Sequence, residues 1–307
     1  MAQADQHTGY GAVLDPTWSQ TLTRSAHPVD GSPVFSTTAV GPGGPSRSVL
    51  LLHGVGNDGS IFGPIMPSLA EFGAVTAPTL APELLTDVGD DRAHMSEKLV
   101  DWLIEVCPPP WHLVGHSMGG VMAGLIMRTR PDLVAGAVLI NSPLPGVVDR
   151  IRTHDTVDRA GRALLFMKAL ATVTQFGRPR LPRVLRGTER AAVRLALRGF
   201  VHDPRRLDDQ VVSRAILGSR TADGNKFIRL AAQLPSWESD PFDAVPVTIV
   251  LGDADPLIPL ADVDRIVASY PAATVEVVAQ SGHFTLLEWP AVVVDAISAC
   301  FTASDAR

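Results

Sequence analysis

The sequence predicts an α/β fold with a mostly parallel central sheet, and three features of its 307 residues support this class. Short, unbroken apolar runs alternate with stretches whose apolar residues recur at helical spacing, as in successive βαβ units. Hydrophobic residues make up 46% and charged residues 19% of the chain, which allows a sizeable buried core and excludes global disorder. At this length we expect one large domain with an insertion.

The expected strands are apolar at consecutive positions, because a parallel strand is buried on both faces. They are Ser48–Leu52, Trp111–Val114, Ala135–Ile140, Val247–Leu251, the Val-rich Thr274–Val278 and the weaker candidate Gly73–Ala77. The expected helices are about Arg92–Val106, Met118–Arg130, Ala261–Ser269 and Ala291–Cys300. Residues 1–47 contain several Pro and Gly residues and are expected to form edge strands and loops.

Segment 147–235 interrupts this alternation. It has no convincing strand, and it carries 18 Lys and Arg against 8 Asp and Glu, whereas the rest of the chain carries 8 against 24. We predict that 147–235 is a helical cap inserted into a core of residues 1–146 and 236–307. The alternative is that most of these charges lie on solvated helix faces.

Composition also excludes several classes of protein. The two cysteines, Cys107 and Cys300, cannot form a disulfide framework, and no Cys/His cluster has the spacing of a metal site. The net charge of −6 argues against a nucleic-acid binder. The first residues lack the pattern of a signal peptide, and no run of 18 apolar residues is present. We therefore expect a cytoplasmic protein without a transmembrane segment.

The most informative stretch is Gly-His-Ser-Met-Gly at residues 115–119, which follows an apolar strand and runs directly into a helix. This is the context that a Gly-x-Ser-x-Gly nucleophile elbow requires. So tight a turn strains the backbone of Ser117 and leaves no room for side chains at Gly115 and Gly119. It exposes the Ser117 hydroxyl above the sheet, and it places the Met118 N–H at a helix N-terminus, where it can face a developing oxyanion.

A second oxyanion donor is expected after the strand that ends at Leu52. There the chain reads His53-Gly54-Val55-Gly56, and the Val55 N–H is our candidate donor. The two glycines would let the main chain approach a substrate closely. An ordinary Gly-rich turn is the alternative interpretation, and His53 is expected to be a structural hydrogen-bonding residue.

A serine nucleophile needs a base within reach, and His283 lies between the last predicted strand and the last helix. The orienting acid should follow another strand, and both Asp253 and Asp255 follow Val247–Leu251. Either Asp could hold the imidazolium; we prefer Asp255, and in that case Asp253 is free to cap the turn. The residue after Ile140 is Asn141, which offers no carboxylate and so favours Asp255.

The order Ser117, Asp255, His283 is that of the α/β-hydrolases, which the sequence resembles. The resemblance covers about residues 48–145 and 236–303 and rests on Leu52-His53-Gly54, Gly115–Gly120, Gly252–Asp255 with Pro259, and Gly282-His283-Phe284 with Glu288. It implies an α/β-hydrolase fold, with helices on both faces of the sheet and an inserted helical cap. It also implies substrate contacts at His53, Gly54, Phe62, His116 and Phe284. Many relatives have Trp where this chain has Phe62.

These residues predict a serine hydrolase that cleaves a carboxylic ester, thioester or lactone through an acyl-enzyme on Ser117. Epoxide hydrolases and haloalkane dehalogenases have an Asp nucleophile, which disfavours their chemistry here. The reaction requires neither a metal nor an organic cofactor, so we expect none. Alternatives are C–C bond hydrolysis, or biosynthetic acyl transfer or cyclisation, by the same triad. A non-catalytic ligand receptor is disfavoured, because all three triad positions are filled.

The basic segment suggests the kind of acyl substrate. A cluster of arginines would attract an anionic small molecule, a CoA phosphate or an acidic carrier protein by electrostatic steering. The cluster consists of Arg178, Arg180, Arg183, Arg186, Arg190, Arg194 and Arg198. A membrane-surface role for the same arginines is the less favoured interpretation.

Overall fold

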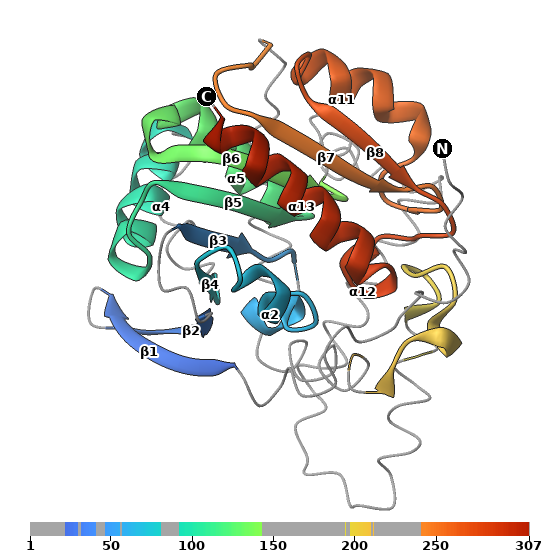
Figure 1. The fold of residues 1–307 in the computed structure, drawn as a ribbon, viewed down its shortest axis with the longest axis horizontal. Coiled ribbons are helices and arrows are strands. Elements are labelled where there is room, and N and C mark those ends of the chain that lie inside the picture. The colour runs from blue at the N-terminus through green and yellow to red at the C-terminus, as the bar shows by residue number, and fades with distance from the viewer. Residues whose placement is uncertain are drawn as a thin grey trace, which may run out of the picture.

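The computed structural model describes residues 22–29, 32–40, 47–55, 57–80, 92–142, 194, 197–209, 211 and 241–306. Within them eight strands form one sheet in the order β1-β2-β4-β3-β5-β6-β7-β8 (Figure 1). The strands are β1 Thr23–Val29, β2 Ser32–Val40, β3 Ser48–Leu52, β4 Ala74–Pro78, β5 Trp111–His116, β6 Val134–Ile140, β7 Val247–Gly252 and β8 Thr274–Val278. β2 pairs antiparallel with β1 and β4, and every pairing from β4 to β8 is parallel. The predicted mostly parallel sheet is confirmed.

Helices cover both faces of the sheet. The α-helices are α2 Met66–Leu69, α4 Arg92–Val106, α5 Met118–Thr129, α11 Val263–Ser269, α12 Thr285–Glu288 and α13 Pro290–Asp305. Short 3-10 turns are η1 Gly59–Phe62, η2 Pro131–Leu133, η4 Pro204–Arg206 and η5 Leu260–Asp262. In Figure 1, α13 crosses the front of β6 and β7, next to α2 and α12, whereas α5 lies behind the sheet.

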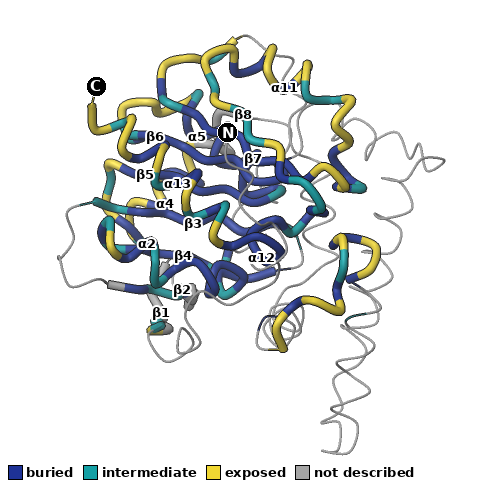
Figure 2. The backbone as a smooth tube through the Cα atoms, turned by 45° about the vertical axis from the view of Figure 1, so that its right-hand side comes forward, coloured by how far each residue is buried: buried dark blue, intermediate teal, exposed yellow. Residues whose placement is uncertain are grey.

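The core consists of two clusters, one on each face of the sheet. Along β3, Val49 and Leu51 belong to the cluster with α2, α12 and α13, while Leu50 and Leu52 belong to the cluster with α4, α5 and α11. A central parallel strand therefore buries successive side chains on opposite faces, which explains its unbroken apolar sequence. Figure 2 shows the central strands buried and much of α11 exposed.

The predicted cap, residues 147–235, lies largely outside the described residues. Its described part, 194, 197–209 and 211, contributes Leu197, Val201, Leu207 and Val211 to the α12–α13 side of the core.

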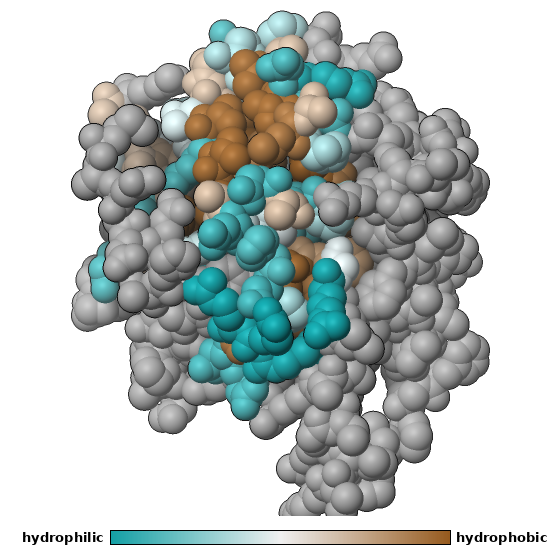
Figure 3. Space-filling view, turned by 90° about the vertical axis from the view of Figure 1, so that its right-hand side faces the viewer, coloured by the Kyte–Doolittle hydropathy of each residue, from teal (hydrophilic) through white to brown (hydrophobic). Residues whose placement is uncertain are grey.

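On the face that Figure 3 presents, a patch of apolar residues lies above a group of hydrophilic ones. Within the described part of the chain, no helix is both long enough and apolar enough to cross a membrane.

The topology places the predicted site residues at one edge of the sheet. β3, β5, β6, β7 and β8 are neighbours in the sheet and run parallel, so their carboxyl ends meet at the same edge. Ligands of open α/β sheets bind outside this edge. The loops that leave these five strands are therefore the place to look for chemistry.

Candidate active site

Ser117 occupies the sharp turn between β5 and α5. Its backbone has φ 53° and ψ −123°, a left-handed conformation that costs a non-glycine residue about 1–3 kcal/mol and that tends to persist at functional sites. Its main-chain N–H donates to the Ile140 carbonyl at 2.9 Å, and the Ser142 hydroxyl donates to its carbonyl at 3.2 Å. These bonds fix the elbow against the end of β6.

Three glycines allow the chain to pack closely around this turn. A Cβ on Gly119 would lie 1.9 Å from the Leu52 carbonyl oxygen, and one on Gly115 would lie 2.5 Å from the Gly120 Cα. A Cβ on Gly54 would lie 2.8 Å from the Ser117 Cβ. The loop after β3 therefore passes directly beside the nucleophile candidate, as the oxyanion prediction requires.

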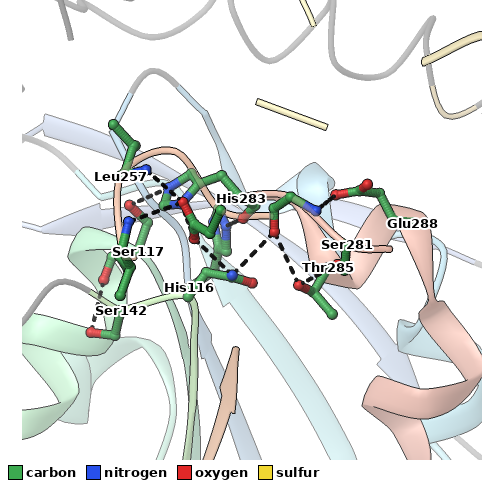
Figure 4. A network of polar contacts seen from close by, with 12 residues as sticks. His116, Ser117, Ser142, Leu257, Ser281, His283, Thr285 and Glu288 are labelled. Carbon is green, nitrogen blue, oxygen red and sulfur yellow. Dashed lines mark hydrogen bonds and ion pairs between the residues drawn. The ribbon is translucent and has the colours of Figure 1, made fainter. Parts of the chain in front are cut away.

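His283 and Asp255 complete a chain of hydrogen bonds with Ser117 (Figure 4). The His283 Nε2 is 3.0 Å from the Ser117 Oγ, and its Nδ1 is 2.9 Å from the Asp255 Oδ2. An ionised carboxylate only accepts hydrogen bonds, so the Nδ1 carries the proton and the Nε2 is left to accept from the hydroxyl. Of the two candidate acids, Asp255 is the one that reaches the imidazole. Asp253 is exposed and accepts a hydrogen bond from the Ser281 N–H at 3.2 Å.

The Asp255 carboxylate is buried and fully engaged. Its Oδ1 accepts hydrogen bonds from the N–H groups of Leu257 at 2.8 Å and Ile258 at 3.1 Å. Its Oδ2 accepts from the Asn141 amide at 2.8 Å as well as from His283. A buried charge is tolerable only when it is hydrogen-bonded in this way. The same bonds fix the direction in which the carboxylate faces the imidazole.

The loop that carries His283 is held from its other side by Glu288 and by the described part of the predicted cap. The fully buried Glu288 accepts hydrogen bonds from the Gly282 N–H at 2.8 Å and from the His202 N–H at 2.7 Å. The His283 N–H donates to the Phe200 carbonyl at 2.5 Å. The position of the imidazole therefore depends on residues 200–202.

The two proposed oxyanion donors are the N–H groups of Met118, which follows Ser117, and of Val55, which follows the Gly54 that packs beside Ser117. Met118 is the first residue of α5, and its N–H is one of the first-turn groups for which a helix supplies no carbonyl. Val55 lies in the loop after β3. The Val55 carbonyl accepts a hydrogen bond from the Asn57 side chain at 3.3 Å. Both positions are consistent with the prediction, and the roles of the two N–H groups remain proposals.

His53 and His116 are buried, neutral histidines with structural bonds. The His53 Nδ1 donates to the Gly54 carbonyl at 2.9 Å, and its Nε2 accepts from the Leu80 N–H at 2.9 Å. Burial lowers the pKa of His53. The His116 Nε2 donates to the His283 carbonyl at 2.9 Å; burial, followed by the nearby His283, lowers the pKa of His116 to about 3.

The low pKa of His116 predicts acid sensitivity of the fold. An unfolded histidine has a pKa of about 6.5, so between pH 6.5 and about 3 the unfolded chain binds a proton at this position that the folded chain does not. The free energy of unfolding should fall as pH decreases through this window. For this one group the slope approaches about 1.4 kcal/mol per pH unit. His116→Asn should remove that contribution, as measured by urea denaturation at pH 7, 6, 5 and 4.

A matched control is His202→Asn, because the side chain of His202 is exposed. This variant should keep the slope of the unmodified protein. If the free energy of unfolding of the His116→Asn protein changed with pH as steeply as that of the unmodified protein, the prediction would be contradicted, whatever the stability of that variant at pH 7.

The other predicted substrate contacts differ in exposure. Phe284 is half-buried, and its ring stacks on His116 with centroids 5.2 Å apart. Phe62 is fully buried in the α12–α13 core cluster, and Gly54 is buried beside the nucleophile. Substrate contact at these residues stays a prediction.

Most of the predicted arginine cluster lies outside the described residues, which include only Arg194 and Arg198. Arg194 donates to the carbonyls of Pro204 and Leu207 and to the Asp209 carboxylate. Its guanidinium is therefore engaged within the chain. Within the described part of the chain, no group of three or more His, Cys, Asp or Glu side chains is placed to hold a metal ion.

Two residues of the site were missed by sequence reasoning. The sequence pattern identifies Asn141 only as a position without a carboxylate, and Glu288 only as part of a motif. Both act through side-chain bonds to loops distant in sequence, which no local pattern reveals. The one available signal for Asn141 was its position directly after a buried strand.

Comparison with known proteins agrees with this geometry. A model of the alpha/beta hydrolase family matches residues 49–296. An uncharacterised protein of Mycobacterium tuberculosis is 25% identical over 278 residues, covering 83% of this chain and 75% of its own. Lipase LipV of the same organism is 32% identical over 130 residues, covering 38% and 44%. The structure of a serine hydrolase from Cycloclasticus zankles superposes with a TM-score of 0.63 at 19% identity, covering 92% and 98%. This chain belongs to the alpha/beta hydrolase family.

Proposed function

We propose that this protein is a serine hydrolase that cleaves a carboxylic ester, thioester or lactone through an acyl-enzyme on Ser117. The observation that carries the proposal is the pair of hydrogen bonds at the His283 ring, 3.0 Å to the Ser117 Oγ and 2.9 Å to the Asp255 Oδ2. A nucleophile bonded to a base that a third group orients is the signature of covalent catalysis. The names lipase and serine hydrolase among similar proteins agree with it.

In the proposed reaction, the His283 Nε2 takes the Ser117 proton as the Oγ attacks the substrate carbonyl carbon. Asp255 holds the imidazole in the correct tautomer and stabilises the imidazolium. The N–H groups of Val55 and Met118 bind the oxyanion, and each such donor contributes about 3 kcal/mol to lowering the barrier. The imidazolium then protonates the leaving group, and the neutral His283 activates water, which releases the acid and restores Ser117.

We further propose that residues 147–235 form a cap that shapes the substrate pocket. The support comes from the bonds of residues 200–202 to the loop that carries His283. A cap attached to the loop that carries the base would select the acyl group and orient the base at the same time. We therefore expect the acyl preference to follow the cap rather than the sheet.

A fluorophosphonate probe tests the covalent step. The peptide that contains Ser117 should gain the mass of the probe less that of hydrogen fluoride, because the activated serine oxygen displaces fluoride from the phosphorus and the serine proton leaves with it. Ser117→Ala should abolish labelling, whereas Ser298→Ala, which changes a serine on α13, should not. Absence of labelling in the folded protein would contradict the proposal. A series of p-nitrophenyl esters of different chain length would then define the acyl preference.

A further inference from the structure

Asn141 bonds to both of the loops that carry the acid and the base. It follows β6 directly, and its side chain is fully buried. Its Nδ2 donates to the Asp255 Oδ2 at 2.8 Å and to the Gly282 carbonyl at 3.2 Å, while its main-chain N–H donates to the Val250 carbonyl at 2.8 Å. Both side-chain partners only accept hydrogen bonds, so the amide nitrogen must face them. One amide group therefore joins the exit of β6 to the loops that follow β7 and β8.

The local structure makes Asn141 an unfavourable residue in two respects. Its backbone has φ 44°, and among the described residues only Ser117 and Gln280 are other non-glycine positions with positive φ. Its Oδ1 is buried without a hydrogen-bond partner in the described structure, which typically costs about 1–3 kcal/mol. Strain and an unpaired polar atom at one residue commonly indicate function.

We propose that Asn141 is a positioning residue of the triad. It fixes Asp255 against the loop that carries His283, and it limits how strongly Asp255 attracts the proton of His283. This inference rests on the proposed serine-hydrolase function. The Asp255 Oδ2 accepts hydrogen bonds from both the Asn141 Nδ2 and the His283 Nδ1. The amide donor shares the negative charge of this oxygen, so the imidazolium feels less of it.

Other titratable groups around His283 come from several elements. They are Asp255 after β7, His116 at the end of β5 with its ring centroid 5.1 Å away, Glu288 on α12, Asp253 bonded to Ser281, and His202, whose N–H binds Glu288. Substitution at Asn141 replaces none of these residues, and of their contacts it removes only the hydrogen bond to Asp255. A shift in the titration of His283 in a variant that only removes the side chain of Asn141 therefore reports the loss of the amide.

The series consists of Asn141→Gly and Asn141→Asp. Glycine accepts φ 44° without strain and removes the amide, and aspartate keeps the shape but turns a carboxylate oxygen toward the Asp255 Oδ2. Relative to the unmodified protein, the titration midpoint of the His283 ring should rise by about 0.5–1 pH unit in Asn141→Gly, and it should also rise in Asn141→Asp at pH values where both carboxylates are ionised. NMR titration of the ring Cε1–H measures this midpoint, with the resonance assigned by its loss in His283→Gln.

Glu288→Gln is the matched control, because Glu288 also holds the Gly282 main chain, but through a bond that does not involve Asp255. It should lower kcat/KM without raising the midpoint. Unchanged midpoints in both Asn141 variants, or an equal rise in Glu288→Gln, would overturn the inference. Asn141→Asp still tests it if the glycine variant does not fold. The titration needs no turnover, so a protein that hydrolyses no ester would contradict the proposed function and leave this test intact.

Discussion

Replacing His283 with alanine is expected to lower kcat/KM for an activated ester by a factor on the order of 10⁴–10⁶. In the proposed reaction the imidazole takes the Ser117 proton, and its Nε2 lies 3.0 Å from the hydroxyl. Without it the hydroxyl keeps its ordinary, weakly nucleophilic state. Initial rates with a p-nitrophenyl ester chosen from the chain-length series provide the measurement.

Two controls separate loss of the base from loss of the fold. His202→Ala removes an exposed imidazole near the same loop and should change the rate less than about threefold, because the main-chain N–H of His202, which binds Glu288, is kept. Free imidazole added to the His283→Ala protein should restore part of the rate, because it can bind in the space left by the His283 ring and act as the base. Retention of more than about 1% of the original rate without imidazole would mean that another group acts as the base.

The sequence was sufficient to predict the sheet and the convergence of Ser117, Asp255 and His283 at its edge. Buried parallel strands have unbroken apolar runs, so the bounds of β3 and β8 were predicted to the residue and those of β5 and β7 to within two. The site followed from one topological rule, because the carboxyl ends of parallel strands meet at one edge. Residues that follow different parallel strands are therefore expected at one edge of the sheet from the sequence alone.

The supporting contacts could not be predicted from the sequence in the same way. The choice between Asp253 and Asp255 depends on how one loop folds back, with the Ala254 N–H donating to the Ser281 carbonyl at 2.8 Å. Asn141 and Glu288 act through hydrogen bonds to main-chain atoms distant in sequence, Asn141 to the Gly282 carbonyl and Glu288 to the His202 N–H. Such bonds depend on tertiary placement within a few tenths of an ångström, and periodicity gives no information at that scale.

Gly119→Ala is expected to have the largest effect on the fold. The added Cβ would lie 1.9 Å from the Leu52 carbonyl oxygen and 2.4 Å from the Leu52 carbonyl carbon, which are backbone atoms at the end of β3. A strand paired on both sides cannot move aside, so α5 would have to shift away from the sheet. We expect a loss of about 4 kcal/mol or more in the free energy of unfolding, measured by urea denaturation.

Gly136→Ala is the matched control for this prediction. A Cβ there would lie 3.1 Å from the Ser304 Oγ and 3.8 Å from the Cys300 Sγ, which are side-chain atoms of α13 that can move by a few tenths of an ångström. Alanine is also favoured over glycine within a strand, so the change should stay within about 1 kcal/mol. Equal stabilities of the two variants would mean that α5 is not packed against the backbone of β3 as closely as this structure has it. In that case the end of β3 and the elbow at Ser117 would not be held together by this contact.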